Sequence, residues 1–280
     1  MYTEVMKKII FAAILCAVLS QAASAQTGRK GVRISMEELS VQNGENLIYG
    51  KVFFPKDEEK HPAIILSHGY NGSHSDFIDD CRFFAQNGYV AYCYDFCGGS
   101  TRSRSSGRTA DMSLLTEKSD LIAVINHFET MDNVDRSRIY LLGGSQGGLV
   151  SALAAEDVPQ KVKAMALYFP AFCIPGDWRK KFPGDSAVPE SLDFWGMTLG
   201  KDFLSGAVSM NVDEATGRYG GNVLIIHGDS DDIVPLRYSQ EAVKRYPHAK
   251  LEVMPGERHG FSPAAAARAR KMVLQFTESN

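Results

Sequence analysis

Residues 139–148 read IYLLGGSQGG, and this stretch decides the fold of the chain. Four apolar residues lead directly into a run of small residues that holds Ser145 in a G-x-S-x-G pattern, and a helical pattern begins at Gln146. Small residues on both sides of the serine allow a tight strand-to-helix turn, because they relieve crowding of the backbone. Such a turn lifts the hydroxyl above the carboxyl edge of a sheet, so we expect Ser145 to be a catalytic nucleophile.

Short apolar runs alternate with longer helical patterns along the chain. The runs rich in β-branched or aromatic residues are 47–54, 63–67, 89–94, 139–142, 164–169, 223–227 and 251–254. The helical patterns are 75–86, 113–130, 146–156, 237–246 and 264–276. This alternation predicts an α/β fold with a mainly parallel sheet and helices on both faces. Residues 171–218 interrupt it with Pro, Gly, Trp and Lys, which predicts an insertion, here called the cap, over the sheet edge where ligands bind.

Composition places the chain among ordinary globular proteins. Its 280 residues are 44% hydrophobic and 22% charged, which suits one large domain and excludes a disordered or collagen-like chain. The net charge is −3, from 30 Lys+Arg and 33 Asp+Glu. Because nucleic-acid binders that neutralise phosphates are usually basic, we expect no nucleic-acid partner.

The first 25 residues have the pattern of a secretory signal peptide. Lys7 and Lys8 precede an almost wholly apolar run over 9–19, and Ala23-Ser24-Ala25 offers a small-residue cleavage site. No later segment approaches the roughly 18 continuous apolar residues of a membrane span. We therefore expect a mature domain over 26–280 that is secreted or periplasmic, without stable membrane insertion.

Export would permit disulfides, and the mature chain keeps four cysteines, Cys81, Cys93, Cys97 and Cys173. The four cysteines either form one or two disulfide bridges or serve as small buried hydrophobic side chains. A zinc site is not expected, because no C-x-x-C pair or histidine cluster accompanies these cysteines.

A serine hydroxyl needs a base to take its proton and an acid to orient that base. His259 follows the last predicted strand and precedes a helical pattern, so we expect it to be the base. The loop after the strand at 223–227 carries three carboxyl side chains, those of Asp229, Asp231 and Asp232. These loops leave the carboxyl ends of their strands, so they meet Ser145 at one edge of the sheet.

The negative charge that develops on the carbonyl oxygen of a substrate attacked by Ser145 needs backbone N–H donors. One is expected from Gln146, the residue after the serine. The second is expected from Tyr70, in the loop that follows the strand at 63–67 and reads HGYNG over 68–72. We interpret His68 as a structural hydrogen-bonding residue inside this turn.

These motifs resemble those of the α/β-hydrolase superfamily. In chain order they are S-H-G-Y at 67–70, G-x-S-x-G at 143–147, H-G-x-x-D-x-x-V-P at 227–235 and H-G at 259–260. The family spacing implies that Asp231 is the acid, so that Ser145, Asp231 and His259 form a triad. Within the superfamily the chain is most similar to the small cinnamoyl and feruloyl esterases. Those enzymes carry a short cap insertion after the sixth strand and cleave esters that join ferulate-type acids to plant polysaccharide.

The resemblance also implies a substrate-binding residue. Residues 188–195 are similar to the insertion in which an aromatic side chain of those esterases helps to hold the phenolic acid, so we nominate Trp195. Other side chains could line the same pocket or simply pack the cap, namely Tyr70, Phe172, Trp178, Phe182, Phe194, Met197 and Phe203. The chain departs from many relatives at 95–100, which reads DFCGGS, and at Gly144, where histidine is common.

The expected activity is hydrolysis of a small or oligosaccharide ester through an acyl-enzyme, with no metal and no organic cofactor. A serine peptidase of the prolyl-oligopeptidase or acylaminoacyl-peptidase type is an alternative, disfavoured because such enzymes usually carry a large N-terminal propeller. A lipase or thioesterase is a second alternative. A non-enzymatic binding module on this fold is a third, disfavoured because no triad member is missing. The Ser-rich loop with Arg102, Arg104 and Arg108 is interpreted as solvated.

Overall fold

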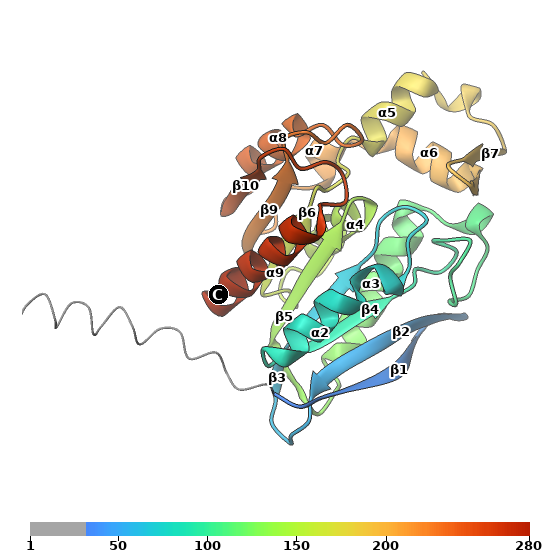
Figure 1. Cartoon of the computed structure of the whole chain (residues 1–280). Helices are drawn as coiled ribbons and strands as arrows, with labels where there is room; N and C mark the ends of the chain where they lie inside the picture. The colour runs from blue at the N-terminus through green and yellow to red at the C-terminus, as the bar shows by residue number, and fades with distance from the viewer. Residues whose placement is uncertain (1–31) are drawn as a thin grey trace, which may run out of the picture. The chain divides into compact units, whose positions relative to one another are not determined.

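The computed structural model describes residues 32–280, and the segment interpreted as a signal peptide lies outside them. An eight-stranded sheet forms the centre of the described part, in the order β1-β2-β4-β3-β5-β6-β9-β10 (Figure 1). Its strands are β1 (Ile34–Asn43), β2 (Asn46–Pro55), β3 (His61–Ser67), β4 (Val90–Tyr94), β5 (Val134–Gly144), β6 (Ala164–Tyr168), β9 (Asn222–Gly228) and β10 (Ala249–Met254). From β4 to β10 all neighbours are parallel, while β2 is antiparallel to both β1 and β4. The predicted α/β fold with a mainly parallel sheet is confirmed.

The central strands are buried on both faces, which explains their continuous apolar sequences. Every residue of β4 and β6 is buried, and all seven predicted strands are present. The sequence analysis missed β1. This edge strand pairs only with β2, exposes Glu37 and Glu38, and has Val41 as its one buried residue. Its sequence therefore lacks the apolar run by which the other strands were recognised.

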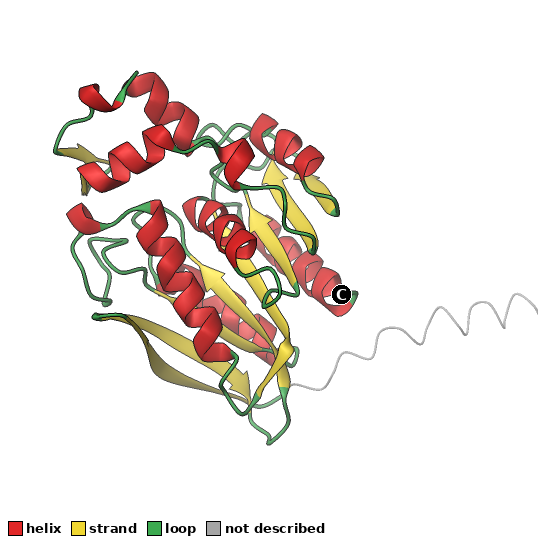
Figure 2. Ribbon diagram, turned by 180° about the vertical axis from the view of Figure 1, so that it is seen from behind, coloured by secondary structure: helices red, strands yellow, loops and turns green. Residues whose placement is uncertain are grey.

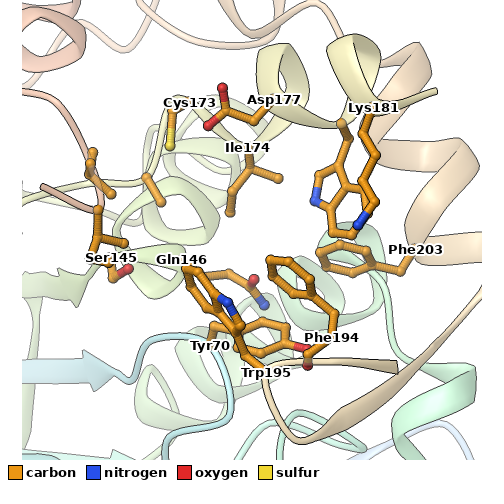
Figure 3. Close-up of a pocket in the computed structure, with 14 residues that line it drawn as sticks. Tyr70, Ser145, Gln146, Cys173, Ile174, Asp177, Lys181, Phe194, Trp195 and Phe203 are labelled. Atoms are coloured by element: carbon orange, nitrogen blue, oxygen red, sulfur yellow. The ribbon is translucent and has the colours of Figure 1, made fainter. Parts of the chain in front are cut away.

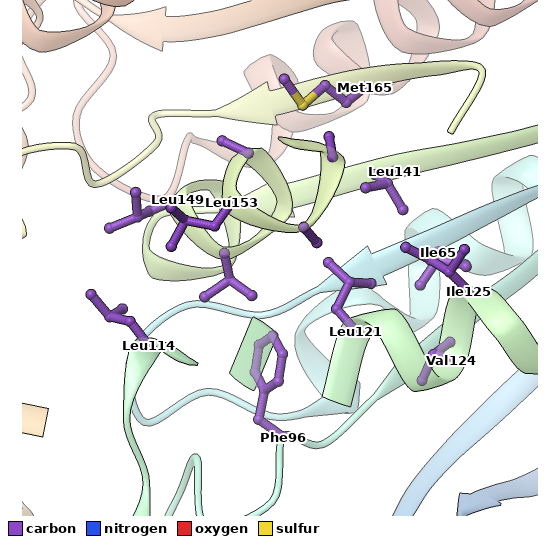
Figure 4. Close-up of a cluster of buried hydrophobic side chains, with 14 of the residues drawn as sticks. Ile65, Phe96, Leu114, Leu121, Val124, Ile125, Leu141, Leu149, Leu153 and Met165 are labelled. Atoms are coloured by element: carbon purple, nitrogen blue, oxygen red, sulfur yellow. The ribbon is translucent and has the colours of Figure 1, made fainter. Parts of the chain in front are cut away.

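Helices cover both faces of the sheet (Figures 1 and 2). One face packs against α3 (Leu114–Phe128), α4 (Gln146–Asp157) and α8 (Arg237–Arg245), and the other against α2 (Ile78–Gln86) and α9 (Pro263–Glu278). Figure 4 shows apolar side chains of α3 and α4 gathered against Ile65, Leu141 and Met165 of the sheet. Short 3₁₀ helices lie at His74–Phe77, Thr109–Asp111 and Asp185–Ala187.

The cap joins β6 to β9 and lies above the carboxyl ends of the parallel strands (Figure 2). It contains α5 (Ile174–Lys181), β7 (Ser191–Phe194), β8 (Met197–Gly200), α6 (Lys201–Ser209) and α7 (Val212–Ala215). The strands β7 and β8 form an antiparallel hairpin, which the sequence analysis did not predict. Its turn residues Trp195 and Gly196 both have positive φ, 42° and 78°, as tight hairpin turns require.

The cysteines at 81, 93, 97 and 173 are all free and buried in this structure. They match the alternative of small buried side chains. Burial raises the pKa of the Cys173 thiol to about 12. Within residues 32–280 no three His, Cys, Asp or Glu side chains gather as a metal site would require. In the same part of the chain no helix has the length and apolarity that crossing a bilayer demands.

Candidate active site

Ser145 lies on the turn between β5 and α4, and close packing surrounds it. Its φ is 52°, in a region that residues other than glycine rarely adopt. A Cβ on Gly147 would come within 2.3 Å of the Ser67 carbonyl oxygen, so only glycine fits there. The Ser145 N–H donates to the Tyr168 carbonyl oxygen at 2.9 Å. These constraints hold the serine hydroxyl at the carboxyl edge of the sheet, as its motif predicts.

A continuous chain of hydrogen bonds joins Ser145, His259 and Asp231. Ser145 Oγ lies 3.0 Å from Nε2 of His259, and Nδ1 of His259 lies 2.8 Å from Oδ2 of Asp231. With a neutral imidazole, the serine hydroxyl donates to Nε2 while Nδ1–H donates to the carboxylate. The structure therefore brings together the three residues to which the sequence assigned the triad, from the loops after β5, β9 and β10.

The carboxylate of Asp231 is fixed by its own loop. Its Oδ1 accepts hydrogen bonds from the N–H groups of Ile233 and Val234, both at 2.9 Å. Its side chain is completely buried, and Nε2 of the buried His227 lies 3.2 Å from Oδ2. Burial lowers the pKa of His227, which favours the neutral ring. Asp231 thus keeps Oδ2 directed at His259.

The neighbouring carboxyls are engaged elsewhere. Asp229 accepts a hydrogen bond from the Gly256 N–H at 2.7 Å, which ties together the loops after β9 and β10. Asp232 forms an exposed ion pair with Arg258. Neither carboxyl contacts the imidazole. Of the three carboxyl groups in this loop, only that of Asp231 is hydrogen-bonded to His259.

The loop that carries His259 is held at the start of α9. Glu257 accepts hydrogen bonds from the N–H and the hydroxyl of Ser262, both at 2.8 Å. The same Ser262 hydroxyl accepts from the N–H of Ala265 and so caps α9. The ring of Phe169 packs against the imidazole with 4.6 Å between centroids. His259 is therefore held by the hydrogen bonds at the start of α9 and by aromatic packing.

The loop after β3 approaches Ser145 closely. A Cβ on Gly69 would lie 3.1 Å from Cβ of Ser145, so the residue before Tyr70 lies directly against Ser145. Neither the N–H of Tyr70 nor that of Gln146 donates to an acceptor within residues 32–280. Both are therefore free to donate to a substrate oxygen.

His68 holds this loop in place. Its Nε2 accepts from the Phe96 N–H at 3.1 Å, and its Nδ1–H donates to the Gly69 carbonyl oxygen at 2.7 Å. Burial lowers the pKa of His68, so the ring is neutral, as these two bonds require. The interpretation of His68 as a structural residue is confirmed.

A first cavity of about 170 Å³ opens beside Ser145 and extends beneath α5 of the cap (Figure 3). Its aromatic lining consists of Tyr70, Trp178, Phe194, Trp195 and Phe203. The Tyr70 hydroxyl donates to the Phe194 carbonyl oxygen at 2.6 Å, and Phe194 stacks on Trp195 with 4.6 Å between centroids. Trp195 itself is 62% exposed, so it lies at the mouth of the cavity.

The remaining aromatic candidates of the cap do not line this cavity. Phe172 and Met197 are buried in the main core, and Phe182 packs beside Trp178. The sequence analysis missed Ile174, Asp177 and Lys181, which do line it. All three lie on α5 at the spacing of one helix face, and this periodicity is the signal that could have found them.

The Lys181 ammonium gives the first cavity a charged end. Its Nζ lies 5.3 Å from the ring centroid of Trp178 and 5.4 Å from that of Phe194, within cation–π range. Figure 3 shows Lys181 at the end of the cavity away from Ser145. The cavity is therefore apolar along its length, with polar groups from α5 at its border.

Gln146, which carries one of the two free backbone N–H groups, is hydrogen-bonded through its side chain to a buried carboxyl. The side-chain amide of Gln146 donates to Oε2 of Glu117 on α3 at 2.8 Å. Glu117 is only 1% exposed, and burial raises its pKa to about 8. The sequence analysis did not single out Glu117, because one acidic residue in a helical pattern looks like an ordinary surface position.

The arginines of the Ser-rich loop are bound to protein groups. Arg104 forms an ion pair with Glu38 at 3.0 Å. Arg108 forms a bidentate ion pair with Asp111, with both hydrogen bonds at 2.7 Å. None of the loop's arginines lines the cavity beside Ser145.

A serine on a strand-to-helix turn, hydrogen-bonded to a histidine above a mainly parallel sheet, defines the class: the protein is an α/β-hydrolase. Residues 75–280 match the prolyl oligopeptidase family, and the chain belongs to that family.

The chain is also similar to individual proteins. A solved structure of Est1E from Butyrivibrio proteoclasticus with ferulic acid bound is 26% identical, with a TM-score of 0.77 over 86% of this chain and all of that one. Feruloyl esterase B of Neurospora crassa is 24% identical over 69% of this chain and 67% of its own length. An uncharacterized 31.7 kDa protein of Escherichia coli, from the traX-finO intergenic region, is 34% identical over 40% of this chain. The match spans 38% of the length of that relative.

Proposed function

We propose that this protein is a serine ester hydrolase in which Ser145 is the nucleophile, His259 the general base and Asp231 the group that orients the base. The observation that carries the proposal is the chain of hydrogen bonds from Asp231 through His259 to Ser145, with links of 2.8 and 3.0 Å. Relatives named as esterases support the same reaction class.

The reaction proceeds in two acyl transfers. Nε2 of His259 takes the proton of Ser145 as Oγ attacks the ester carbonyl carbon, and the oxyanion accepts hydrogen bonds from the N–H groups of Tyr70 and Gln146. The imidazolium, stabilised by Asp231, then gives its proton to the departing alcohol oxygen, which leaves an acyl-enzyme. In the second transfer His259 deprotonates a water that attacks the acyl carbonyl, and the proton returns to Ser145 as the acid leaves.

For the acyl group we propose a hydroxycinnamoyl, feruloyl-type acid. The first cavity is narrow and lined by aromatic rings, which suits a flat aryl group, and Trp195 closes its mouth. The side chains of Lys181 and Asp177 offer polar partners for a ring hydroxyl at the border of the cavity. Esters of such acids with plant polysaccharide are the proposed natural substrates.

We also propose that the protein acts outside the cytoplasm, because its first 25 residues have the composition of a signal peptide. Mass spectrometry of the protein recovered from its native host should find a chain that begins at Gln26. A chain in the cytoplasm that retains residues 1–25 would contradict export.

The function is tested by hydrolysis of methyl ferulate, p-nitrophenyl acetate and a long-chain p-nitrophenyl ester, with wild type and Ser145→Ala. Cleavage of methyl ferulate that is lost in Ser145→Ala is the expected result. Cleavage of the acetate or the long-chain ester alone would keep the serine mechanism and discard the hydroxycinnamoyl assignment. Equal activity of Ser145→Ala and wild type on every ester would overturn the mechanism.

Peptide hydrolysis is a second candidate, favoured by one observation, the match to the prolyl oligopeptidase family. The same nucleophile and base can cleave an amide, since both reactions pass through an acyl-enzyme. Blocked prolyl and alanyl p-nitroanilides distinguish the two functions. Turnover of an anilide at a kcat/KM above that of every ester would make this protein a peptidase.

A further inference from the structure

Ser145 separates two cavities. The second cavity has a volume of about 410 Å³ and shares Tyr70, Ser145, Trp195 and Ile233 with the first. Its volume lies within the range of small-molecule binding sites. An ester bound at Ser145 therefore has room on both sides of its carbonyl carbon.

The position of His259 decides which part of the ester lies in which cavity. His259 lines the second cavity and not the first. Because His259 must deliver a proton to the departing alcohol oxygen, that oxygen has to lie next to Nε2. The alcohol part of the substrate therefore enters the second cavity, and the acyl part enters the first.

Polar groups lie in the second cavity beyond His259. Asp80 of α2 is buried, and its Oδ2 lies 3.2 Å from the Arg270 guanidinium of α9. Tyr168, at the end of β6, is 4% exposed, and its buried hydroxyl has no hydrogen-bond partner in the described part of the chain. A buried hydroxyl without a partner costs free energy, so one that borders a cavity points to a ligand that would satisfy it.

Aromatic rings line the rest of the second cavity. Phe261 packs edge-on against Phe169 and Tyr168, with 4.8 and 5.5 Å between centroids. Phe77 lines it from the side of α2. The cavity therefore combines apolar faces with the carboxyl groups of Asp76 and Asp80 and the phenol of Tyr168, a pattern suited to a ring that carries hydroxyl groups.

We propose that the second cavity is a leaving-group site for a polyhydroxylated alcohol, such as a sugar, with Asp80 and Tyr168 as its hydroxyl-binding residues. Sugar hydroxyls can donate to the Asp80 carboxylate and accept from Tyr168, while the aromatic rings pack on the C–H faces of the sugar. Arg270 neutralises the charge of Asp80, so the site favours neutral hydroxyls over an ammonium group. A methyl or ethyl alcohol would leave the Tyr168 hydroxyl without a partner.

The inference rests on the proposed ester hydrolysis and is tested with two alcohols that carry the same acid. The substrates are 5-O-feruloyl-arabinose and methyl ferulate, and a second pair, 5-O-acetyl-arabinose and methyl acetate, removes any dependence on the acyl group. Wild type should show a higher kcat/KM for the sugar ester in each pair that it cleaves. Tyr168→Phe should lower the ratio of sugar-ester to methyl-ester kcat/KM by about three- to tenfold, chiefly through KM, because one neutral hydrogen bond is lost.

The matched control is Tyr246→Phe, which removes the hydroxyl of another tyrosine that is 4% exposed but lies outside both cavities. It should leave the ratio at the wild-type value. Asp80→Asn should lower the ratio by about tenfold or more, since a bond to a charged group is lost. Its thermal unfolding is recorded in parallel, because this change also removes the partner of Arg270.

Three outcomes would overturn the inference. They are equal kcat/KM for the sugar and methyl esters in wild type, an unchanged ratio in Tyr168→Phe, and an equal fall of the ratio in Tyr246→Phe. Each leaves the proposed ester hydrolysis intact, because methyl esters are still cleaved. If wild type cleaves none of the four esters and none of the p-nitrophenyl esters, the proposed function fails and the leaving-group site fails with it.

Discussion

Hydrogen-bond partners decide what each carboxyl near His259 can do. Asp231 and Asp232 are neighbours in the chain, yet one is completely buried against the imidazole and the other forms an exposed ion pair with Arg258. The difference comes from the turn of the loop after β9, where the N–H groups of residues 233 and 234 hold Oδ1 of Asp231. Position in this turn, and not the type of residue, makes Asp231 the partner of the base.

Asp231→Asn should therefore lower kcat by about 10³- to 10⁴-fold. The amide cannot stabilise the imidazolium and favours the wrong tautomer of His259. Steady-state hydrolysis of p-nitrophenyl acetate measures the effect. Asp232→Asn is the matched control, and its kcat should stay within about twofold of wild type, because exposed ion pairs contribute at most about 1 kcal/mol. Similar losses in both variants would refute the assignment of Asp231.

At the scale of elements, the cap hairpin and the loop after β3 form one unit. The Tyr70 hydroxyl is bonded to the carbonyl group of Phe194 in β7, so the loop that supplies an N–H donor is tied to the hairpin that carries Trp195. Asn71 adds a longer contact to the Trp195 carbonyl oxygen at 3.4 Å. The position of the cap is thereby coupled to the geometry around Ser145.

Tyr70→Phe should raise KM for methyl ferulate about three- to tenfold, because one neutral hydrogen bond that holds the hairpin over the first cavity is lost. Its N–H remains in place, so kcat should fall less than KM rises. Tyr140→Phe is the control, since it removes a tyrosine hydrogen bond of similar length, 3.0 Å to the Thr277 carbonyl oxygen, on the α9 side of the sheet. An equal change of KM in the control would show that loss of stability, and not the hairpin contact, causes the effect.

The elements also differ in how well sequence could predict them. Strands β3, β4, β6 and β9 each contain a continuous apolar run that is buried on both faces, and each was recognised. Strand β1 and the β7–β8 hairpin expose half or more of their residues, so tertiary pairing and not an apolar run creates them. The Ser145, His259 and Tyr70 positions follow from local turn motifs. Asp177 and Lys181 share one face of α5 in the sequence pattern, but only the packing of the cap shows that this face lines the cavity. The Gln146–Glu117 contact comes from how α3 packs beside α4, which no local motif records.

At the scale of the whole molecule, different parts of the fold build the two sides of the site. The carboxyl edge of the sheet supplies Ser145, Asp231 and His259, and the cap supplies most of the first cavity. The second cavity is built instead from residues around α2 and α9 and the end of β6. Substitutions in the cap should therefore change the preference for the acid part of the ester. Substitutions around α2 and α9 should change the preference for the alcohol part.

The folded state also holds a carboxyl whose pKa is raised by burial, and this makes stability depend on pH. The pKa of Glu117 is raised from 4.5 to about 8, by burial first and by the charge of Asp120 as a smaller cause, while the bond from Gln146 opposes the shift. The folded chain therefore binds more protons than the unfolded chain between these two values. Stability should fall as pH rises through that range and level off above about pH 8.

Glu117→Gln should remove this part of the pH dependence, because the introduced amide stays neutral and its oxygen can still accept the bond from Gln146. The melting temperature of the variant, relative to wild type, should rise by roughly 8–15 °C between pH 5 and pH 8.5, since each unit of pKa shift corresponds to about 1.4 kcal/mol. Thermal unfolding followed by circular dichroism at several pH values measures it. Glu241→Gln, at an exposed position of α8, removes the same formal charge and should give a difference that does not change with pH. If the two variants respond alike, net charge and not the buried carboxyl sets the pH dependence.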